Sequence, residues 1–361
     1  MGQPSEKICT LPLLADVKQY MACPWDLSQH DELRVYWFGL FRGHFRRLIE
    51  EVEAEYGDDT RLAGRVESMT NSFNRQFDEI EKRGVGAGRL DIIALCRARE
   101  RAIDAGGIED AYRGAKAREN ETALSLLSSW LVQLDGLDEV QRSQRLIEGI
   151  FAGNIFDLGA TETLDLLAGQ PVDFHATLGK LRPRPWLIDD LDTWLKRWAD
   201  RPHRSSVLFV DNAGCDIVLG MIPFARELLR RGTDVLLTAN MEPSLNDVTH
   251  EELTALISTI SQHDGIIRDA LADGRLELVA SGNDIPLIDL SRVSPALAEA
   301  VVRRGVDLVV LEGMGRAIES NLNAAFTCDV VKIAMLKDGN VAGKLGGDLY
   351  DLVFKFEPAM K

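Results

Sequence analysis

The spacing of apolar residues in the first 200 positions predicts helices. Segment 31–56 places apolar residues three and four positions apart, with acidic and basic residues between them. The same pattern recurs, separated by Gly, Asp or Asn, in segments 59–83, 89–105, 118–134 and 138–151. The run Arg-Pro-Arg-Pro-Trp at 182–186 then ends any helix. The pattern therefore predicts a helical N-terminal domain over residues 1–200.

After residue 200, short apolar runs alternate with helical segments. The predicted strands are 206–212, 234–240, 275–282, 307–313, 329–336 and 351–357. The helices predicted between them are 215–231, 247–262 and 294–304. Strands that alternate with helices form a mostly parallel sheet covered on both faces. The sequence thus predicts an α/β domain over residues 201–361.

Charge and cysteine content narrow the function classes. The chain has 57 acidic and 41 basic residues and a formal charge of −16, which argues against a surface that coats nucleic acid. A local basic pocket can still bind a small anion. The five cysteines are far apart and odd in number, which favours reduced thiols in a cytoplasmic protein. We expect no membrane contact, because no apolar run approaches ~18 residues and no signal-peptide pattern is present.

Polar residues collect where the predicted strands end. The first four strands are followed by 211–214, 244–247, 281–284 and 312–316, which are rich in carboxylates, amides and glycines. In open parallel sheets, ligands bind beyond the carboxyl ends of the strands. Loops are polar in most proteins, and Asp247 would also suit the N-cap of the next helix. Four such clusters on one edge nevertheless favour a binding site there.

The residue types in these clusters suit a hard divalent cation. Asp211, Asn212 and Asp247 offer oxygen ligands, which suit Mg²⁺ or Mn²⁺, and no His or Cys joins them to favour zinc. Two carboxylates and one amide balance a divalent charge, and Arg316 or Lys332 would make the pocket positive. Such a pocket favours a phosphate group.

Metal-assisted hydrolysis of a phosphate ester follows from these groups. In this hypothesis Lys332 and Arg316 stabilise negative charge on the phosphoryl oxygens. Asp216 or Glu312 orients the attacking water or accepts its proton, and direct attack by Asp211 remains an alternative. The backbone at Gly313, Met314 and Gly315 can approach a ligand closely and offers N–H donors; these three residues and Arg316 form the candidate substrate-binding segment.

Two other enzyme classes fit the residues less well. A haloacid-dehalogenase-type phosphatase would carry a second Asp two residues after the nucleophile, where this chain has Ala213. A dinucleotide or methyl-donor binder would carry G-x-G-x-x-G after a strand, and Ile318 stands where the third glycine would be.

Several long motifs together resemble the damage-control phosphatases of the domain-of-unknown-function 89 family. They are FVDNAGCDIVLGMIPFARELLRRG (209–232), EPSLNDVT (242–249), SGNDIPLIDLSRVS (281–294), EGMGRAIESNL (312–322) and DLVFKF (351–356). EGMGR resembles the marker of the second subfamily, which includes stand-alone plant proteins and the C-terminal phosphatase domain of pantothenate kinase 4. The resemblance covers most of residues 90–361, whereas the first 80 residues match poorly.

The resemblance implies a Rossmann-like α/β/α three-layer domain after a helical part. It places the metal ligands at Asp211, Asn212 and Asp247, and the substrate-contacting residues at 312–316. A following basic residue falls on Lys332. Asn154 and Asp157 would line the site from the helical side, although a helix-capping role suits them equally.

The resemblance also implies a cofactor and a substrate. The cofactor is a divalent ion: manganese, cobalt, nickel or magnesium. The substrate is a small phosphorylated metabolite, 4′-phosphopantetheine or its oxidised or S-modified forms, whose removal limits the passage of damaged precursor into coenzyme A. A broad sugar-phosphate phosphatase, a carboxyl methyltransferase that uses S-adenosylmethionine, and a non-catalytic metabolite-binding protein remain alternatives, and the oligomeric state stays open.

Overall fold

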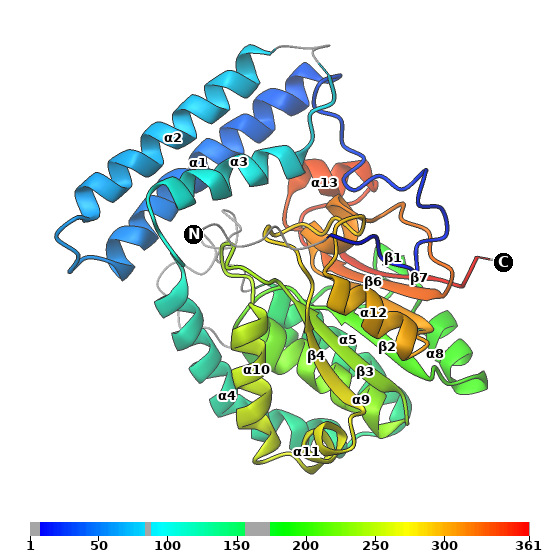
Figure 1. Ribbon diagram of the computed structural model, residues 1–361. Helices are drawn as coiled ribbons and strands as arrows, with labels where there is room; N and C mark the ends of the chain where they lie inside the picture. Colours follow the sequence, from blue (N-terminus) through cyan, green and yellow to red (C-terminus); the bar gives the residue numbers. More distant parts are fainter. Residues whose placement is uncertain (1–7, 84–87, 156–173, 361) are drawn as a thin grey trace.

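The computed structural model describes residues 8–83, 88–155 and 174–360, and a seven-stranded sheet lies at its centre (Figure 1). The strands are β1 Ile188–Asp189, β2 Ser205–Phe209, β3 Asp234–Ala239, β4 Leu276–Ala280, β5 Leu308–Glu312, β6 Asp329–Met335 and β7 Leu352–Glu357. Their order is β1-β7-β6-β5-β2-β3-β4. Strands β2 to β6 pair in parallel, whereas β7 runs antiparallel to β6 and β1 pairs in parallel with β7. The predicted mostly parallel α/β fold is confirmed.

The strand order reverses direction at β2. The chain moves from β2 to β3 and β4 on one side, then returns to the other side of β2 to form β5, β6 and β7. The connections that follow β2 and β5 therefore lead to opposite sides of the sheet centre. This divergence opens a crevice at the carboxyl ends of β2 and β5. The two segments that come after these strands are 210–215 and 313–316.

The long helices lie where the spacing of apolar residues predicts them, whereas some short helices were not predicted. They are α1 Asp31–Glu55, α2 Leu62–Lys82, α3 Ile92–Ala105, α4 Arg113–Asp135, α5 Glu139–Asn154, α7 Phe174–Leu178, α8 Leu191–Asp200, α9 Ile222–Arg230, α10 His250–Ser261, α11 Gly265–Ala272, α12 Pro295–Arg303 and α13 Gly339–Lys344. The predicted helix 215–231 is composite, because a π-helix, η1 Asp216–Met221, precedes α9. A second π-helix, η2 Met314–Glu319, follows β5. The spacing of apolar residues did not predict these π-helical turns, because a π-helical turn contains only one residue more than an α-helical turn.

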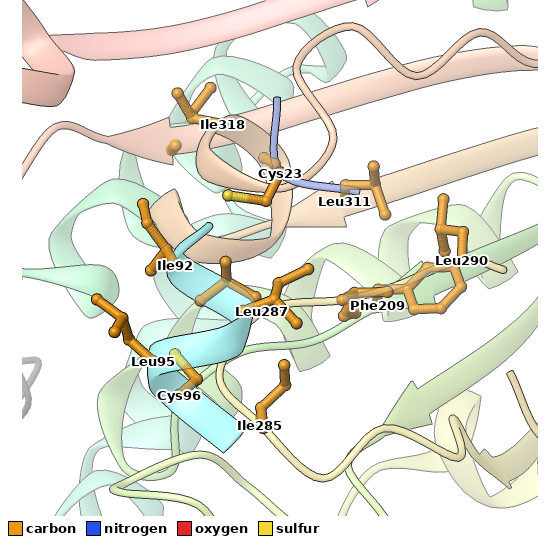
Figure 2. Packing of buried hydrophobic residues seen from close by; sticks show 14 of the residues in the cluster. Cys23, Ile92, Leu95, Cys96, Phe209, Ile285, Leu287, Leu290, Leu311 and Ile318 are labelled. Atoms are coloured by element: carbon orange, nitrogen blue, oxygen red, sulfur yellow. The ribbon is translucent and has the colours of Figure 1, made fainter. Parts of the chain in front are cut away.

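Two hydrophobic cores cover the two faces of the sheet. Along β2, Val207 and Phe209 belong to one core, and Leu208 and Val210 to the other, because successive side chains point to opposite faces. The first core contains residues of α1, α2 and α3, and Figure 2 shows α3 residues packed around Leu287 near Phe209. The second core contains residues of α4, α5 and α8. Each core therefore contains residues from both before and after residue 200.

Aromatic stacking fixes the long N-terminal hairpin. Phe73 of α2 stacks on Phe45 of α1 with ring centroids 3.8 Å apart, and on Phe77 at 4.0 Å. Figure 1 shows α1 and α2 side by side, with α3 crossing next to them above the sheet. Within the described residues, no helix is both long enough and apolar enough to cross a membrane.

Candidate active site

Backbone pairing brings the loops after β2 and β3 together. Asn212 and Asp247 form an isolated antiparallel bridge, Val248 N donates to Asp211 O at 3.0 Å, and Ala213 N donates to the Asn246 carbonyl at 2.9 Å. The next helix, α10, is capped by Thr249 and Glu252, whose side chains each accept from the other's backbone N–H. Asp247 therefore does not serve as the N-cap, and its backbone lies beside that of Asn212.

The segment after β5 closes against Asp211. Gly313 has φ +94° and ψ 150°, a backbone conformation that is essentially restricted to glycine. A methyl group on Gly313 would lie 2.2 Å from Asp211 Oδ2. Arg316, fully buried, donates from Nη2 to Asp247 Oδ2 at 2.7 Å and pairs through Nη1 with Asp211. The guanidinium thus joins the two carboxylates that the sequence predicts as metal ligands.

A buried polar network lies behind these carboxylates. Asn154, the last residue of α5, donates from Nδ2 to Asp216 at 2.8 Å, Glu312 at 2.9 Å and Asp211 at 3.3 Å. Glu312 also accepts the backbone N–H of Asp211 at 2.9 Å. Asn212 Nδ2 donates to Asp211 and Asp216, both at 3.0 Å. Each side chain in the network therefore holds another in place, and the C-terminus of α5 completes the site.

The network concentrates negative charge in a dry region. Burial raises the pKa of Glu312 well above its ordinary value, and the neighbouring Asp216 charge raises it further. Burial also raises the pKa of Asp216, while the positive charge of Lys337 opposes that shift. The Lys337 ammonium donates to the carbonyl of Asn154 at 2.9 Å. The carboxylates of the site therefore need positive charge nearby, which Arg316 and Lys337 supply in part.

A cavity of about 280 Å³ opens onto the front of this cluster. Asp211, Asn212 and Asp247 line it, whereas Asn154, Asp216 and Glu312 are not among its lining residues. Other walls come from α1, α3, the loops after β3 and β4, η2 and the segment after β6. Their residues are Tyr36, Trp37, Leu40, Phe41, His44, Ile92, Cys96, Arg99, Leu245, Asn246, Pro286, Leu287, Met314, Gly315, Glu319, Lys337 and Asp338.

The donor set of the cluster fits a hard divalent cation. The Asn212 amide nitrogen donates to carboxylates, so its oxygen points the opposite way and remains available as a ligand. Carboxylate oxygens of Asp211, Asp216 and Glu312 all lie within 4.8 Å of one another and form a second possible ligand set. Asp216 Oδ1 and Asn154 Oδ1 are buried and accept no hydrogen bond from the described residues. Oxygen donors of this kind suit Mg²⁺ and Mn²⁺.

Not every residue predicted for the substrate reaches the cavity. Met314 and Gly315 line it, while Gly313 and Arg316 pack against Asp211 behind it. Lys332 lies within β6, and its ammonium donates to Glu357 at 2.7 Å and to two backbone carbonyls. Lys332 is not among the residues that line the cavity, whereas Lys337, five positions further along the chain, is.

Other site residues were not foreseen from the sequence. Lys337 directly follows the predicted strand 329–336, so the rule of strand ends would have pointed to it. The α1 residues carried no such signal, because their apolar spacing is that of any packed helix. Asp157 lies outside the described residues.

The fold and the oxygen donors at the carboxyl ends of the strands define an α/β protein with a candidate cation site where the strand order of its sheet reverses. Residues 42–353 match the damage-control phosphatase ARMT1-like domain, and the chain belongs to this family of phosphatases. A solved structure of a domain-of-unknown-function 89 family protein from Pyrococcus horikoshii shares the fold, with a TM-score of 0.63 over 90% of this chain and 98% of that one, at 16% identity.

Relatives with established names are more similar in sequence. A damage-control phosphatase of Arabidopsis thaliana is 46% identical over 346 residues, which cover 93% of each chain. The 4′-phosphopantetheine phosphatase of Mus musculus is 32% identical over the full length of this chain, which spans 50% of that protein. Pantothenate kinase 2 of Oryza sativa is 38% identical, and the match covers 96% of this chain and 41% of the kinase.

Proposed function

We propose that this chain is a divalent-metal-dependent phosphatase of small phosphate monoesters, with 4′-phosphopantetheine and its oxidised or S-modified forms as substrates. The observation that carries the proposal is the set of three oxygen donors, Asp211, Asn212 and Asp247, at the cavity wall. The mouse relative, which aligns with the whole length of this chain, is named a 4′-phosphopantetheine phosphatase, and this name supports the proposed substrate. The proposed location is the cytoplasm, which agrees with five cysteines that form no disulfide.

Asp211, Asn212 and Asp247 would hold the ion, which we propose to be Mn²⁺, Co²⁺, Ni²⁺ or Mg²⁺. When bound, it supplies Lewis-acid polarisation of the phosphoryl group and lowers the pKa of a water molecule. The network of Asn154, Asp216 and Glu312 orients the ligands from behind, as the supporting partners of metal ligands do in many sites.

The protein's own cations balance the negative charge around the phosphate in this proposal. Lys337 lines the cavity and places its ammonium beside the carboxylate network. Arg316 binds both Asp211 and Asp247 and offsets their negative charge. This reduces the repulsion between the two carboxylates and an anionic ester. Positive groups fixed in a dry site stabilise the charge that develops on transferring phosphoryl oxygens.

The test measures phosphate release from 4′-phosphopantetheine, its sulfonate and fructose 1-phosphate. Each substrate is assayed with EDTA and with each of the four ions, for the wild type and for Asp211→Asn. Asp264→Asn is the matched control, because Asp264 is as buried as Asp211, at 7% exposed, but lies at the start of α11 outside the cavity.

The outcomes separate metal, mechanism and substrate. Metal-dependent release that prefers the pantetheine compounds and disappears in Asp211→Asn alone would support the proposal. Release from fructose 1-phosphate alone would keep the phosphatase and overturn the substrate, in favour of a sugar-phosphate phosphatase. No release with any ion, while Mn²⁺ still raises the melting temperature of the wild type, would indicate a non-catalytic binding protein.

A further inference from the structure

The chain segment 8–23, which comes before the first helix, lies across two elements of the site. Its backbone pairs with the loop after β4, where Cys9 and Val293 exchange N–H···O bonds of 3.0 and 2.8 Å. It also pairs with the end of η2, where Cys23 N donates to Ser320 O at 2.9 Å. The segment therefore contacts the two stretches of chain whose residues at the cavity are Pro286, Leu287, Met314 and Gly315.

The hydroxyl group of Tyr20 joins the segment to both stretches. Its oxygen accepts the backbone N–H of Leu290 at 2.9 Å, and the hydroxyl donates to Asn321 Oδ1 at 2.8 Å. Because the Leu290 N–H can only donate, the proton of the hydroxyl is directed to Asn321. Burial raises the pKa of the Tyr20 hydroxyl above its ordinary value, so the group keeps this proton.

The amide of Asn321 extends this contact to Arg316. With Oδ1 directed at Tyr20, Nδ2 donates to the carbonyl oxygens of Arg316 and Ile288, both at 3.0 Å. The Asn321 side chain is 1% exposed, and a rotated amide would turn its own oxygen toward both carbonyls. Buried acceptors without a donor are costly, so the Tyr20 hydroxyl determines which way the amide points.

The π-helix η2 depends on such side-chain donors. Ser320 N donates to Gly315 O at 3.0 Å, a bond between residues five apart that closes the wide turn. The Ser320 hydroxyl also donates to Gly315 O at 2.6 Å, and Asn321 Nδ2 donates to the Arg316 carbonyl. These contacts hold the backbone of Arg316 while its guanidinium binds the two carboxylates of the proposed metal site.

We propose that Tyr20 is a positioning residue of the enzyme: through Asn321 it fixes the turn that carries Arg316. With this turn in place, the Arg316 guanidinium stays against Asp211 and Asp247. The inference rests on the proposed phosphatase function and gives the N-terminal segment a role in it. Tyr20 is not among the described residues that line the cavity, so it acts on the reaction through Arg316 and not by touching the substrate.

The experiment uses Tyr20→Phe, which keeps the ring and removes the hydroxyl. Thr233→Val is the matched control, because it removes a fully buried hydroxyl that donates to the His203 carbonyl at 2.8 Å. Thr233 directly precedes β3, at the edge of the sheet opposite the site. The wild type and both variants are compared in thermal unfolding, in kcat and KM for 4′-phosphopantetheine with Mn²⁺, and in backbone hydrogen exchange followed by mass spectrometry.

We expect Tyr20→Phe to lower kcat about tenfold and to change KM less than threefold, because Arg316 packs behind the cavity. Amides of residues 315–321 should exchange about tenfold faster, and those of β2 and β3 should keep their wild-type rates. Thr233→Val should lower the melting temperature and leave kcat unchanged. An unchanged kcat in Tyr20→Phe, or a loss that lies in KM, would overturn the proposal.

A second variant, Asn321→Ala, tests the route from Tyr20 to Arg316. It should lower kcat at least as much as Tyr20→Phe does, because it removes the donor to the Arg316 carbonyl. Adding Tyr20→Phe to Asn321→Ala should then change kcat less than twofold, since residues that act through one contact are not additive. Losses that multiply in the double variant would contradict this route.

Hydrogen exchange separates this inference from the proposed function, because it does not depend on turnover. A wild type that releases no phosphate contradicts the phosphatase function. Faster exchange confined to residues 315–321 in Tyr20→Phe would then still support the contact between Tyr20 and η2. Unchanged exchange in these residues would contradict that contact whether or not the protein is an enzyme.

Discussion

Replacing Gly313 with alanine tests how closely the chain after β5 must approach Asp211. The added methyl group would lie 2.2 Å from Asp211 Oδ2 and 2.4 Å from Cγ. Carbon atoms of side chains essentially never approach other atoms within 3.0 Å, so the carboxylate would have to withdraw by about 0.8 Å. The new side chain would also hold a backbone conformation of φ +94° and ψ 150°, at a cost on the order of 1–3 kcal/mol.

The displacement of Asp211 sets the expected loss of activity. A misplacement of about 1 Å in a catalytic arrangement can reduce the rate ~10²-fold. We therefore expect Gly313→Ala to lower kcat for phosphate release by ~10²-fold and to weaken Mn²⁺ binding, since Asp211 is a proposed ligand. The assay pairs phosphate release with Mn²⁺ titration followed by electron paramagnetic resonance.

Gly232→Ala is the control for the backbone cost. Gly232 also has a positive φ, +83°, but a methyl group there would meet no atom within 4 Å. Both variants should lose stability in thermal unfolding, and only Gly313→Ala should lose activity and metal affinity. Wild-type activity and Mn²⁺ affinity in a folded Gly313→Ala, or an equal loss of both in Gly232→Ala, would refute the reasoning.

Three further predictions concern the charged groups. Lys337→Met should reduce phosphate release at least tenfold, whereas Lys332→Met should stay within about threefold of the wild type, and the reverse result would reinstate Lys332 as the basic group of the site. Burial lowers the pKa of Lys332 to about 8 from 10.5, so the folded protein releases this proton at lower pH than the unfolded chain. Thermal stability of the wild type relative to Lys332→Met should therefore rise between pH 8 and 10.5, and parallel pH profiles would contradict the shift. Asn154→Asp should lower both melting temperature and activity, because it replaces the donor shared by Asp211, Asp216 and Glu312 with another acceptor; unchanged values would show that the network does not need the amide.

The strands were predictable because their signal is local. Each of β2 to β6 is a short, mostly apolar run, and the predicted ranges agree with the structure to within a few residues. The loops after them could be assigned to one edge, because parallel strands place their carboxyl ends together. The juxtaposition of Asp211, Asn212 and Asp247 follows from that rule and from the family resemblance.

The parts that the sequence did not reveal depend on tertiary contact. Lys332 and Lys337 are both basic and only five residues apart, but β6 directs the first to Glu357 and ends just before the second. Trp37 and its neighbours on α1 have the spacing of an ordinary core-facing helix, and only the packing of the hairpin shows that they border the cavity. The hydrogen-bond network joins Asn154 to Glu312, which lies 158 positions away in the sequence.

The two π-helices that come after β2 and β5 bear on how this family can vary. Each successive residue of an α-helix turns by about 100°, and a π-helical turn accommodates one residue more than an α-helical one. Deleting one residue from η1 would let its wide turn close to α-helical spacing, with α9 left close to its present register. Because η1 carries Asp216 and η2 carries Arg316, substitution of these residues should disturb the site more than a change in the length of the π-helical turn alone.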